Sequence, residues 1–115
     1  SITKENIGVV GLSQTNKANS GVLQISDIKF TRDDNGGGVI EIPYIGDSQI
    51  KVKDERAGEK LLLSLNAVAY PQKLIKRIDT TDFDTPIKYI DSSGGNNQLK
   101  ISIINRGSWY YALYQ

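Results

Sequence analysis

The sequence predicts an all-β domain, a sandwich of two packed sheets with about seven or eight short strands. Segments in which apolar and polar residues alternate recur through residues 22–115, and this period is typical of strands with one buried face. Clusters of Gly, Asn, Asp, Ser and Pro separate the segments at intervals of about eight to twelve residues, as in β-sandwiches. One stretch, residues 72–78, has apolar side chains at helical spacing and predicts one short helix.

Residues 1–21 are predicted to lie outside this domain, which we place at residues 22–115. Small and polar residues predominate in the segment, and its apolar residues, Ile7 to Leu12, include two glycines and keep no sustained period. Such a composition favours a flexible linker or tail. The alternatives are plain disorder and a short edge strand near Val9.

The first two strands of the domain are expected at residues 22–30 and 39–45. In the first, the apolar side changes near Ser26, which predicts a β-bulge there. In the second, alternate residues are apolar, but Pro43 has no backbone N–H to donate. Because an interior strand needs that donor, we predict that this strand lies at a sheet edge or breaks at Pro43.

The second half of the chain is expected to contain the rest of the sandwich. The most apolar segment, residues 60–69, is predicted to be a central strand that is covered on both sides. The short helix follows it. Further strands are expected at residues 49–53, 87–91, 98–105 and 109–114.

A tightly specified corner precedes the strand at residues 87–91. Asp and Thr occupy most positions from 79 to 85, and their side chains hydrogen-bond to nearby backbone and so compete with regular structure. Pro86 fixes its own φ and keeps Thr85 extended. We therefore expect this corner to hold one shape.

The corner also carries a family resemblance. The run Arg77-Ile-Asp-Thr-Thr-Asp-Phe-Asp-Thr-Pro-Ile resembles the Arg-Leu-Asp-Val-Thr-Asp-Phe-x-Thr-Pro-Val segment of AMIN domains from the PilQ family of type IV pilus secretins. Residues 25–42 are similar to the opening hairpin of those domains, and residues 107–115 to their closing strand. The resemblance implies the AMIN β-sandwich, in agreement with the strand pattern. Thr80 stands where Val is common in the family, which leaves open whether this position is buried.

Composition argues against several classes of function. The net charge is +1, from 14 basic and 13 acidic residues, which gives no reason to expect nucleic acid or an acidic membrane surface as a partner. The chain has no His and no Cys, so it lacks the usual general base and histidine-dependent nucleophiles. No apolar run is long enough to span a bilayer, and the first residues do not resemble a signal peptide. We expect no enzyme and no cofactor.

Two acidic clusters have alternative interpretations. Asp79, Asp82 and Asp84 lie close together in the sequence, as hydrolytic carboxylate pairs must in space, but Asp in a turn-rich corner is usually a local hydrogen-bonding residue. The loop that begins at Asp33 has a calcium-like composition but not the ligand spacing of an EF-hand. We favour structural roles for both clusters and expect no metal site.

Five residues are candidates for ligand binding: Arg32, Arg77, Asp82, Tyr110 and Tyr114. The resembled family also tends to carry Arg, Arg and Asp at the first three positions. Arg77 and Asp82 either pair with each other as structural support or face a cell-wall carboxylate, while Arg32, at the mouth of a loop, is at least as suited to binding. The tyrosines either stack on sugars or on a protein partner, or they are lone surface aromatics.

The resemblance implies a non-catalytic periplasmic module that binds peptidoglycan and anchors or positions an outer-membrane secretin during pilus biogenesis. The implied partners are peptidoglycan, other type IV pilus components, and further copies of the parent chain in a homo-oligomeric secretin ring. The alternative is a docking module that contacts another pilus or secretion component through an edge strand or an aromatic patch. A polar groove with an Arg rim and an aromatic floor would favour the glycan, and an apolar patch beside an unpaired edge would favour docking.

Overall fold

The computed structural model describes residues 7–16 and 22–115, and it confirms the all-β sandwich. The described residues include the short 3₁₀ turns η2 (Gln72–Leu74) and η3 (Thr81–Phe83). The strands are β1 (Ile7–Asn16), β2 (Leu23–Ile25), β3 (Lys29–Arg32), β4 (Gly38–Gly46), β5 (Lys51–Ala57), β6 (Lys60–Asn66), β7 (Val68–Ala69), β8 (Arg77–Asp79), β9 (Ile87–Gly95), β10 (Gln98–Asn105) and β11 (Tyr110–Tyr114).

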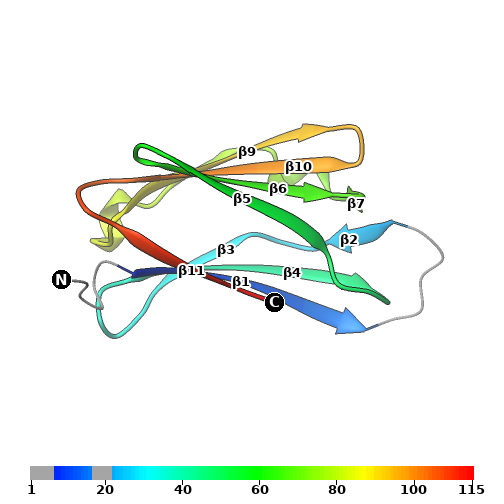
Figure 1. Cartoon of the computed structure of the whole chain (residues 1–115), viewed down its shortest axis with the longest axis horizontal. Coiled ribbons are helices and arrows are strands. Elements are labelled where there is room, and N and C mark those ends of the chain that lie inside the picture. Colours follow the sequence, from blue (N-terminus) through cyan, green and yellow to red (C-terminus); the bar gives the residue numbers. More distant parts are fainter. Residues whose placement is uncertain (1–6, 17–21) are drawn as a thin grey trace.

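The strands form two sheets that lie one above the other along the long axis of the molecule (Figure 1). The first sheet has the order β11-β1-β4-β2-β7, and β3 also pairs with β4. The second sheet has the order β5-β6-β10-β9-β8, in which all neighbours are antiparallel. The prediction of a central strand at residues 60–69 holds for β6, which lies between β5 and β10, but β6 ends at Asn66 and Val68–Ala69 belongs to the first sheet as β7. The predicted cover on both sides is wrong, because the residues that alternate with the buried leucines of β6 are only half-buried.

The core lies between the two sheets. Alternate residues of β4, β6 and β10 are buried, because successive side chains of a strand point to opposite faces. The largest fully buried side chains are those of Tyr44, Ile25, Ile40, Ile42, Leu61, Leu63, Leu65, Ile90, Leu99, Ile101, Ile103 and Val68.

Strand β1 corrects the prediction of a linker at residues 1–21. Ile7–Asn16 is a strand of ten residues that lies between β4 and β11 and runs parallel to both, so it is not an edge strand either. Val10 and Leu12 on its inner side are almost fully buried. The sequence pattern missed β1 because its partners are distant in the chain and glycines interrupt its alternation. The remainder of the predicted linker, 1–6 and 17–21, lies outside the described residues.

Strand β4 corrects the prediction for Pro43. The strand is interior, with β1 on one side and β2 and β3 on the other. The proline is tolerated because it lies opposite the interruption between β2 and β3, where Ser26 N–H donates to its carbonyl at 2.9 Å. At this interruption the buried residues change from odd to even positions, from Leu23 and Ile25 to Ile28, as the sequence predicts near Ser26.

The predicted helix at residues 72–78 is a single 3₁₀ turn, η2, followed by strand β8. Leu74 is buried and anchors the turn. Ile78, which shares a helical face with Leu74 in the sequence pattern, instead pairs with Ile90 of β9. The apolar residues at helical spacing therefore belong to two elements, Leu74 to the turn and Ile78 to the strand. The chain then enters the corner from β8, at the edge of the second sheet.

Candidate functional site

The corner between β8 and β9 is held by its own side chains. Thr80 is completely buried, and its hydroxyl donates to the carbonyl of Ile87 at 2.7 Å. The hydroxyl of Thr85 accepts a hydrogen bond from Ile87 N–H at 3.2 Å. These two bonds satisfy buried hydroxyl groups that would otherwise destabilise the fold, and they explain how Thr replaces an apolar residue at position 80.

Asp79, at the start of the corner, accepts two hydrogen bonds that favour its ionised form. Its Oδ1 accepts hydrogen bonds from Thr81 N–H at 3.0 Å and from the Thr81 hydroxyl at 2.7 Å. These two bonds lower the pKa of Asp79 below its ordinary value of 3.8. Because the pKa is lower in the folded protein, the carboxylate stabilises the fold above the unfolded-state pKa and loses this effect as pH falls through the folded-state pKa.

We expect Asp79→Asn to reduce the loss of stability between neutral and strongly acidic pH. The free energy of unfolding, measured with urea at a series of pH values, would show this as a smaller difference between pH 7 and the acidic limb below about pH 4. Asp82→Asn is the matched control, since Asp82 is a nearby exposed carboxylate in the same corner. If Asp79→Asn lost as much stability in acid as the parent, the carboxylate of Asp79 would not contribute to the acid dependence.

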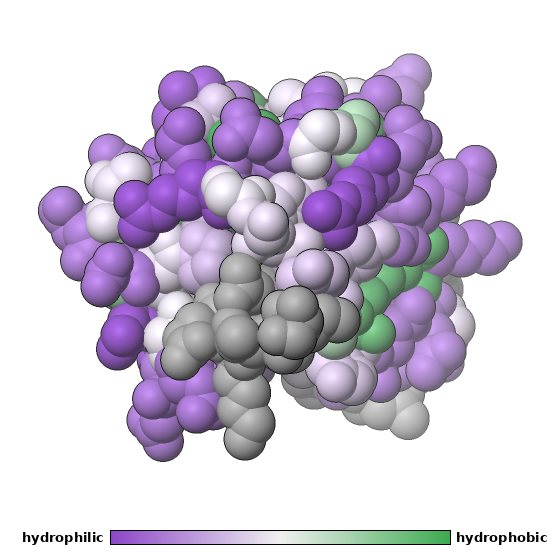
Figure 2. Space-filling model, turned by 60° about the vertical axis from the view of Figure 1, so that its left-hand side comes forward, coloured by the Kyte–Doolittle hydropathy of each residue, from purple (hydrophilic) through white to green (hydrophobic). Residues whose placement is uncertain are grey.

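A groove of about 390 Å³ opens beside this corner at one end of the sandwich. We call it the corner groove; its lining residues are Arg32, Gly36, Asp84, Thr85, Pro86, Arg106, Gly107 and Ser108. They come from three segments that are far apart in the sequence: the β3–β4 loop, the corner, and the β10–β11 turn. Figure 1 shows these three segments at the same end of the molecule, and Figure 2, which turns this end forward, shows a mostly hydrophilic surface there.

Specific contacts tie the three segments together. The ring of Phe30 on β3 meets the ring of Phe83 edge to face, with centroids 4.9 Å apart. The backbone N–H of Arg106 donates to the carbonyl of Pro86 at 2.9 Å. Side chains alternate along β3, so Arg32 lies on the same side of the strand as Phe30 and next to the corner.

The two arginines of the corner groove differ in their partners. One guanidinium nitrogen of Arg106, Nη2, donates to the carbonyl of Thr85 at 3.2 Å and lies 3.6 Å from Asp84 Oδ1. Arg32 is exposed, and its guanidinium makes no hydrogen bond, ion pair or ring contact with residues 7–16 and 22–115. Among the described residues, the groove therefore presents one cation without a partner and one that is only partly paired.

Unusual backbone conformations gather in the same groove. Asp84 adopts a left-handed conformation with φ of 56°, and Gly36 and Gly107 have φ of 84° and 68°. A non-glycine residue in this region is uncommon and is often found at binding sites, where the surrounding structure holds it. Asp tolerates the conformation better than most residues, because its short side chain hydrogen-bonds locally.

Comparison with known proteins identifies the family. The model of the AMIN domain family matches residues 27–115. This chain belongs to the AMIN domain family. The fimbrial assembly protein PilQ of Pseudomonas aeruginosa is 29% identical over 91 residues, which cover 79% of this chain and 13% of that protein. The chain thus spans a small part of the relative's length.

Strand β1 extends the AMIN domain beyond the matched region. The family match begins at residue 27, whereas β1 ends at Asn16 and is paired on both sides. In the described part of the chain, no helix is long and apolar enough to cross a membrane. Among the same residues, no group of three or more His, Cys, Asp or Glu side chains is placed to hold a metal ion.

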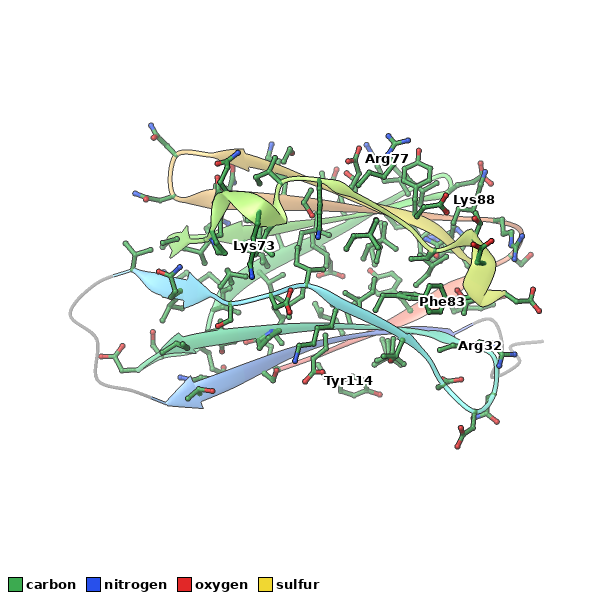
Figure 3. All side chains as sticks on the ribbon, turned by 180° about the vertical axis from the view of Figure 1, so that it is seen from behind. Arg32, Lys73, Arg77, Phe83, Lys88 and Tyr114 are labelled. Carbon is green, nitrogen blue, oxygen red and sulfur yellow. The ribbon has the colours of Figure 1, made fainter. Side chains whose placement is uncertain are left out.

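The five sequence-predicted candidates do not converge in this AMIN domain. Arg32 lines the corner groove, while Asp82 is exposed in η3 of the same corner but not in the lining. Figure 3 shows Arg32 and Phe83 toward the same end of the molecule. In the same view Arg77 lies on the second sheet and Tyr114 lies below the strands of the first sheet.

Arg77 forms a separate cluster on β8 and β9. Its guanidinium pairs with Asp91 at 3.2 Å and lies 4.1 Å from the centre of the Tyr89 ring. The expected pair with Asp82 is therefore wrong: residues 77 and 91 are directly opposite each other in the β8–β9 register, whereas Asp82 lies beyond the end of β8. The ion pair is exposed and so contributes little to stability.

The two tyrosines lie on β11, the edge strand of the first sheet. Tyr110 is half-buried, and Tyr114 is 60% exposed. Three strand-to-strand steps separate β11 from β3, which places the tyrosines roughly 14 Å across the sheet from Arg32. They are not part of the corner groove.

Sequence reasoning missed most of the groove. Arg106, Gly107 and Ser108 lie between the strands predicted at residues 98–105 and 109–114 and give no binding signal of their own, and the sequence predicts for Asp84 only a local hydrogen-bonding role. One signal was available: if the strands predicted at residues 87–91 and 98–105 form a hairpin, the start of the first strand lies next to the end of the second. The structure pairs Ile87 with Asn105, and this pairing places Arg106 next to Pro86.

Proposed function

We propose that this AMIN domain is a non-catalytic peptidoglycan-binding module in the periplasm. It would anchor or position a type IV pilus secretin in the cell wall, with other pilus components and further copies of the parent chain as partners. Family membership and the similarity to a fimbrial assembly protein support this context.

The observation that carries the proposal is the corner groove. It is open, and charged and polar residues are prominent in its lining. Arg32 has no partner among the described residues, and Arg106 is only partly paired. Such a site suits a polymer that offers hydroxyl, amide and carboxylate groups. The expected aromatic floor is absent from the described lining; Phe83, which is 44% exposed, adjoins it through Asp84. A shallow site gives modest affinity, which a ring of many copies would multiply.

Co-sedimentation with isolated peptidoglycan sacculi tests the proposal. We expect saturable pelleting of the parent, and roughly tenfold weaker binding by Arg32→Ala, because a charge-assisted hydrogen bond contributes about 1.5–3 kcal/mol. Lys100→Ala is the matched control: it also removes one exposed cation, but from the outer face of β10. Failure of the parent to pellet at any salt concentration would refute cell-wall binding.

Protein docking is the second candidate, favoured by a specific observation on β11. In the described part of the chain, the outer edge of β11 has no strand neighbour, and Tyr114 on that strand is exposed. An open edge with an aromatic side chain is able to accept a strand from a partner. If Tyr114→Ala abolished binding to a pilus or secretion component but bound sacculi normally, the result would favour this docking role.

A further inference from the structure

We propose that the corner groove recognises a peptide carboxylate, held between Arg32 and Arg106, and not the sugars of the glycan strand. This inference rests on the proposed function and names the part of the polymer that is bound. Carboxylates occur on the peptide stems of peptidoglycan, so the ligand would be an anionic peptide.

Arg106 is held in place by backbone groups. Its N–H donates to the Pro86 carbonyl at 2.9 Å, and its Nη2 donates to the Thr85 carbonyl at 3.2 Å. These contacts fix one side of the guanidinium, while the side chain remains 51% exposed. A guanidinium that is already oriented loses less conformational freedom when it binds a carboxylate.

The carboxylate of Asp84 lies where a ligand carboxylate would bind Arg106, but it interacts with Arg106 only weakly. Its Oδ1 lies 3.6 Å from Arg106 Nη2, too far for a good hydrogen bond, and its side chain is 90% exposed. An ion pair with this geometry has little net free energy. A ligand carboxylate that accepts shorter hydrogen bonds from Arg106 would therefore displace Asp84 at small cost.

Arg32 supplies the second cation from a different segment. It has no partner within residues 7–16 and 22–115, so binding a carboxylate would break no internal ion pair. Space for the ligand is available, because a Cβ added at Gly107 would meet no atom within 4 Å. Two cations from different segments that line one groove match the several acceptor positions of a carboxylate.

Two observations favour the peptide carboxylate over other ligands. The described lining contains no aromatic ring on which a sugar would stack. The chain has a net charge of only +1, so attraction of an anion must come from a local site and not from the field of the whole protein.

Calorimetric titration of the full chain tests the inference with three probes. The probes are a soluble stem peptide with free carboxylates, the same peptide with its carboxylates converted to amides, and chitotetraose as peptide-free glycan. We expect the amide form and chitotetraose to bind at least about tenfold more weakly than the free peptide. Equal affinity for the free and amidated peptides would overturn the inference.

Charge variants give opposite predictions. Arg32→Ala should weaken binding of the free peptide about tenfold, whereas Asp84→Asn should strengthen it about two- to fivefold, because it removes the competing carboxylate. Asn retains the tolerance for a left-handed backbone, and far-UV circular dichroism would verify folding. Lys100→Ala should leave the affinity unchanged. Unchanged or weaker binding by folded Asp84→Asn would contradict displacement of this residue.

Sacculi stripped of their peptide stems separate this inference from the proposed function. Equal pelleting of the parent with stripped and intact sacculi would support the proposed function and overturn the carboxylate site. Pelleting only with intact sacculi supports both. Binding of the soluble peptide without pelleting by intact sacculi would overturn the proposed function and support the carboxylate site.

Discussion

Deletion of residues 1–16 is expected to abolish folding of the domain. The deletion removes β1, which lies in the interior of the first sheet and is the neighbour that pairs with β11. It also removes Val10 and Leu12 from the core. The combined loss is comparable to the whole stability of a small domain, about 5–15 kcal/mol. Far-UV circular dichroism and amide NMR dispersion would report an unfolded or aggregated chain.

Substitutions within β1 distinguish loss of the strand from a general effect of shortening the chain. Leu12→Ala should lower the free energy of unfolding by about 2–5 kcal/mol, because it leaves a cavity in the core. Thr15→Ala, at an exposed position of the same strand, should change it by less than about 0.5 kcal/mol. A cooperatively folded deletion variant with native NMR dispersion would show that β1 is dispensable.

Trp109→Ala is expected to have the largest effect among single substitutions near β11. Trp109 is only 3% exposed, its ring lies 6.0 Å from that of Tyr111, and the guanidinium of Arg56 lies 3.8 Å from its centre. Truncation should lower the free energy of unfolding by about 3–5 kcal/mol through lost burial and an unfilled cavity. Urea unfolding measures this change.

Tyr114→Ala is the matched control for Trp109→Ala. It removes another aromatic ring from the same end of the chain, but this ring is 60% exposed, so the change should stay within about 0.5 kcal/mol. A loss of less than about 1 kcal/mol for Trp109→Ala would contradict the position of the indole between the two sheets.

The strands that could be predicted are those with local signals. β4, β6 and β10 alternate clearly. Each also pairs antiparallel with the strand that precedes it in the chain, β3, β5 and β9 respectively. β1 could not be predicted, because its partners β4 and β11 are remote in the chain and parallel to it. A parallel strand is not joined to its neighbour by a hairpin turn, so no turn signal in the sequence marks it. Glycines at two positions of β1 also interrupt its alternation of apolar and polar residues.

The candidate site was predictable only in part. Arg32 could be selected because it lies at the mouth of a loop, and that loop does reach the corner groove. The pairing of Arg77 could not be derived from the spacing of nearby acids, because the β8–β9 register brings Asp91 opposite it instead. The role of Arg106 depends on where the β9–β10 hairpin places its ends, which local composition does not reveal.

An NMR titration of the ¹⁵N-labelled domain with solubilised peptidoglycan fragments shows directly whether the corner groove binds the cell wall. We expect shifts of backbone amides that line the corner groove, with the largest changes at Gly36, Gly107 and Ser108. Arg32→Ala should reduce these shifts at equal ligand concentration, and Lys100→Ala should not. Shifts confined to β11 around Tyr114, or no shifts at saturating ligand, would show that the corner groove is not the binding site.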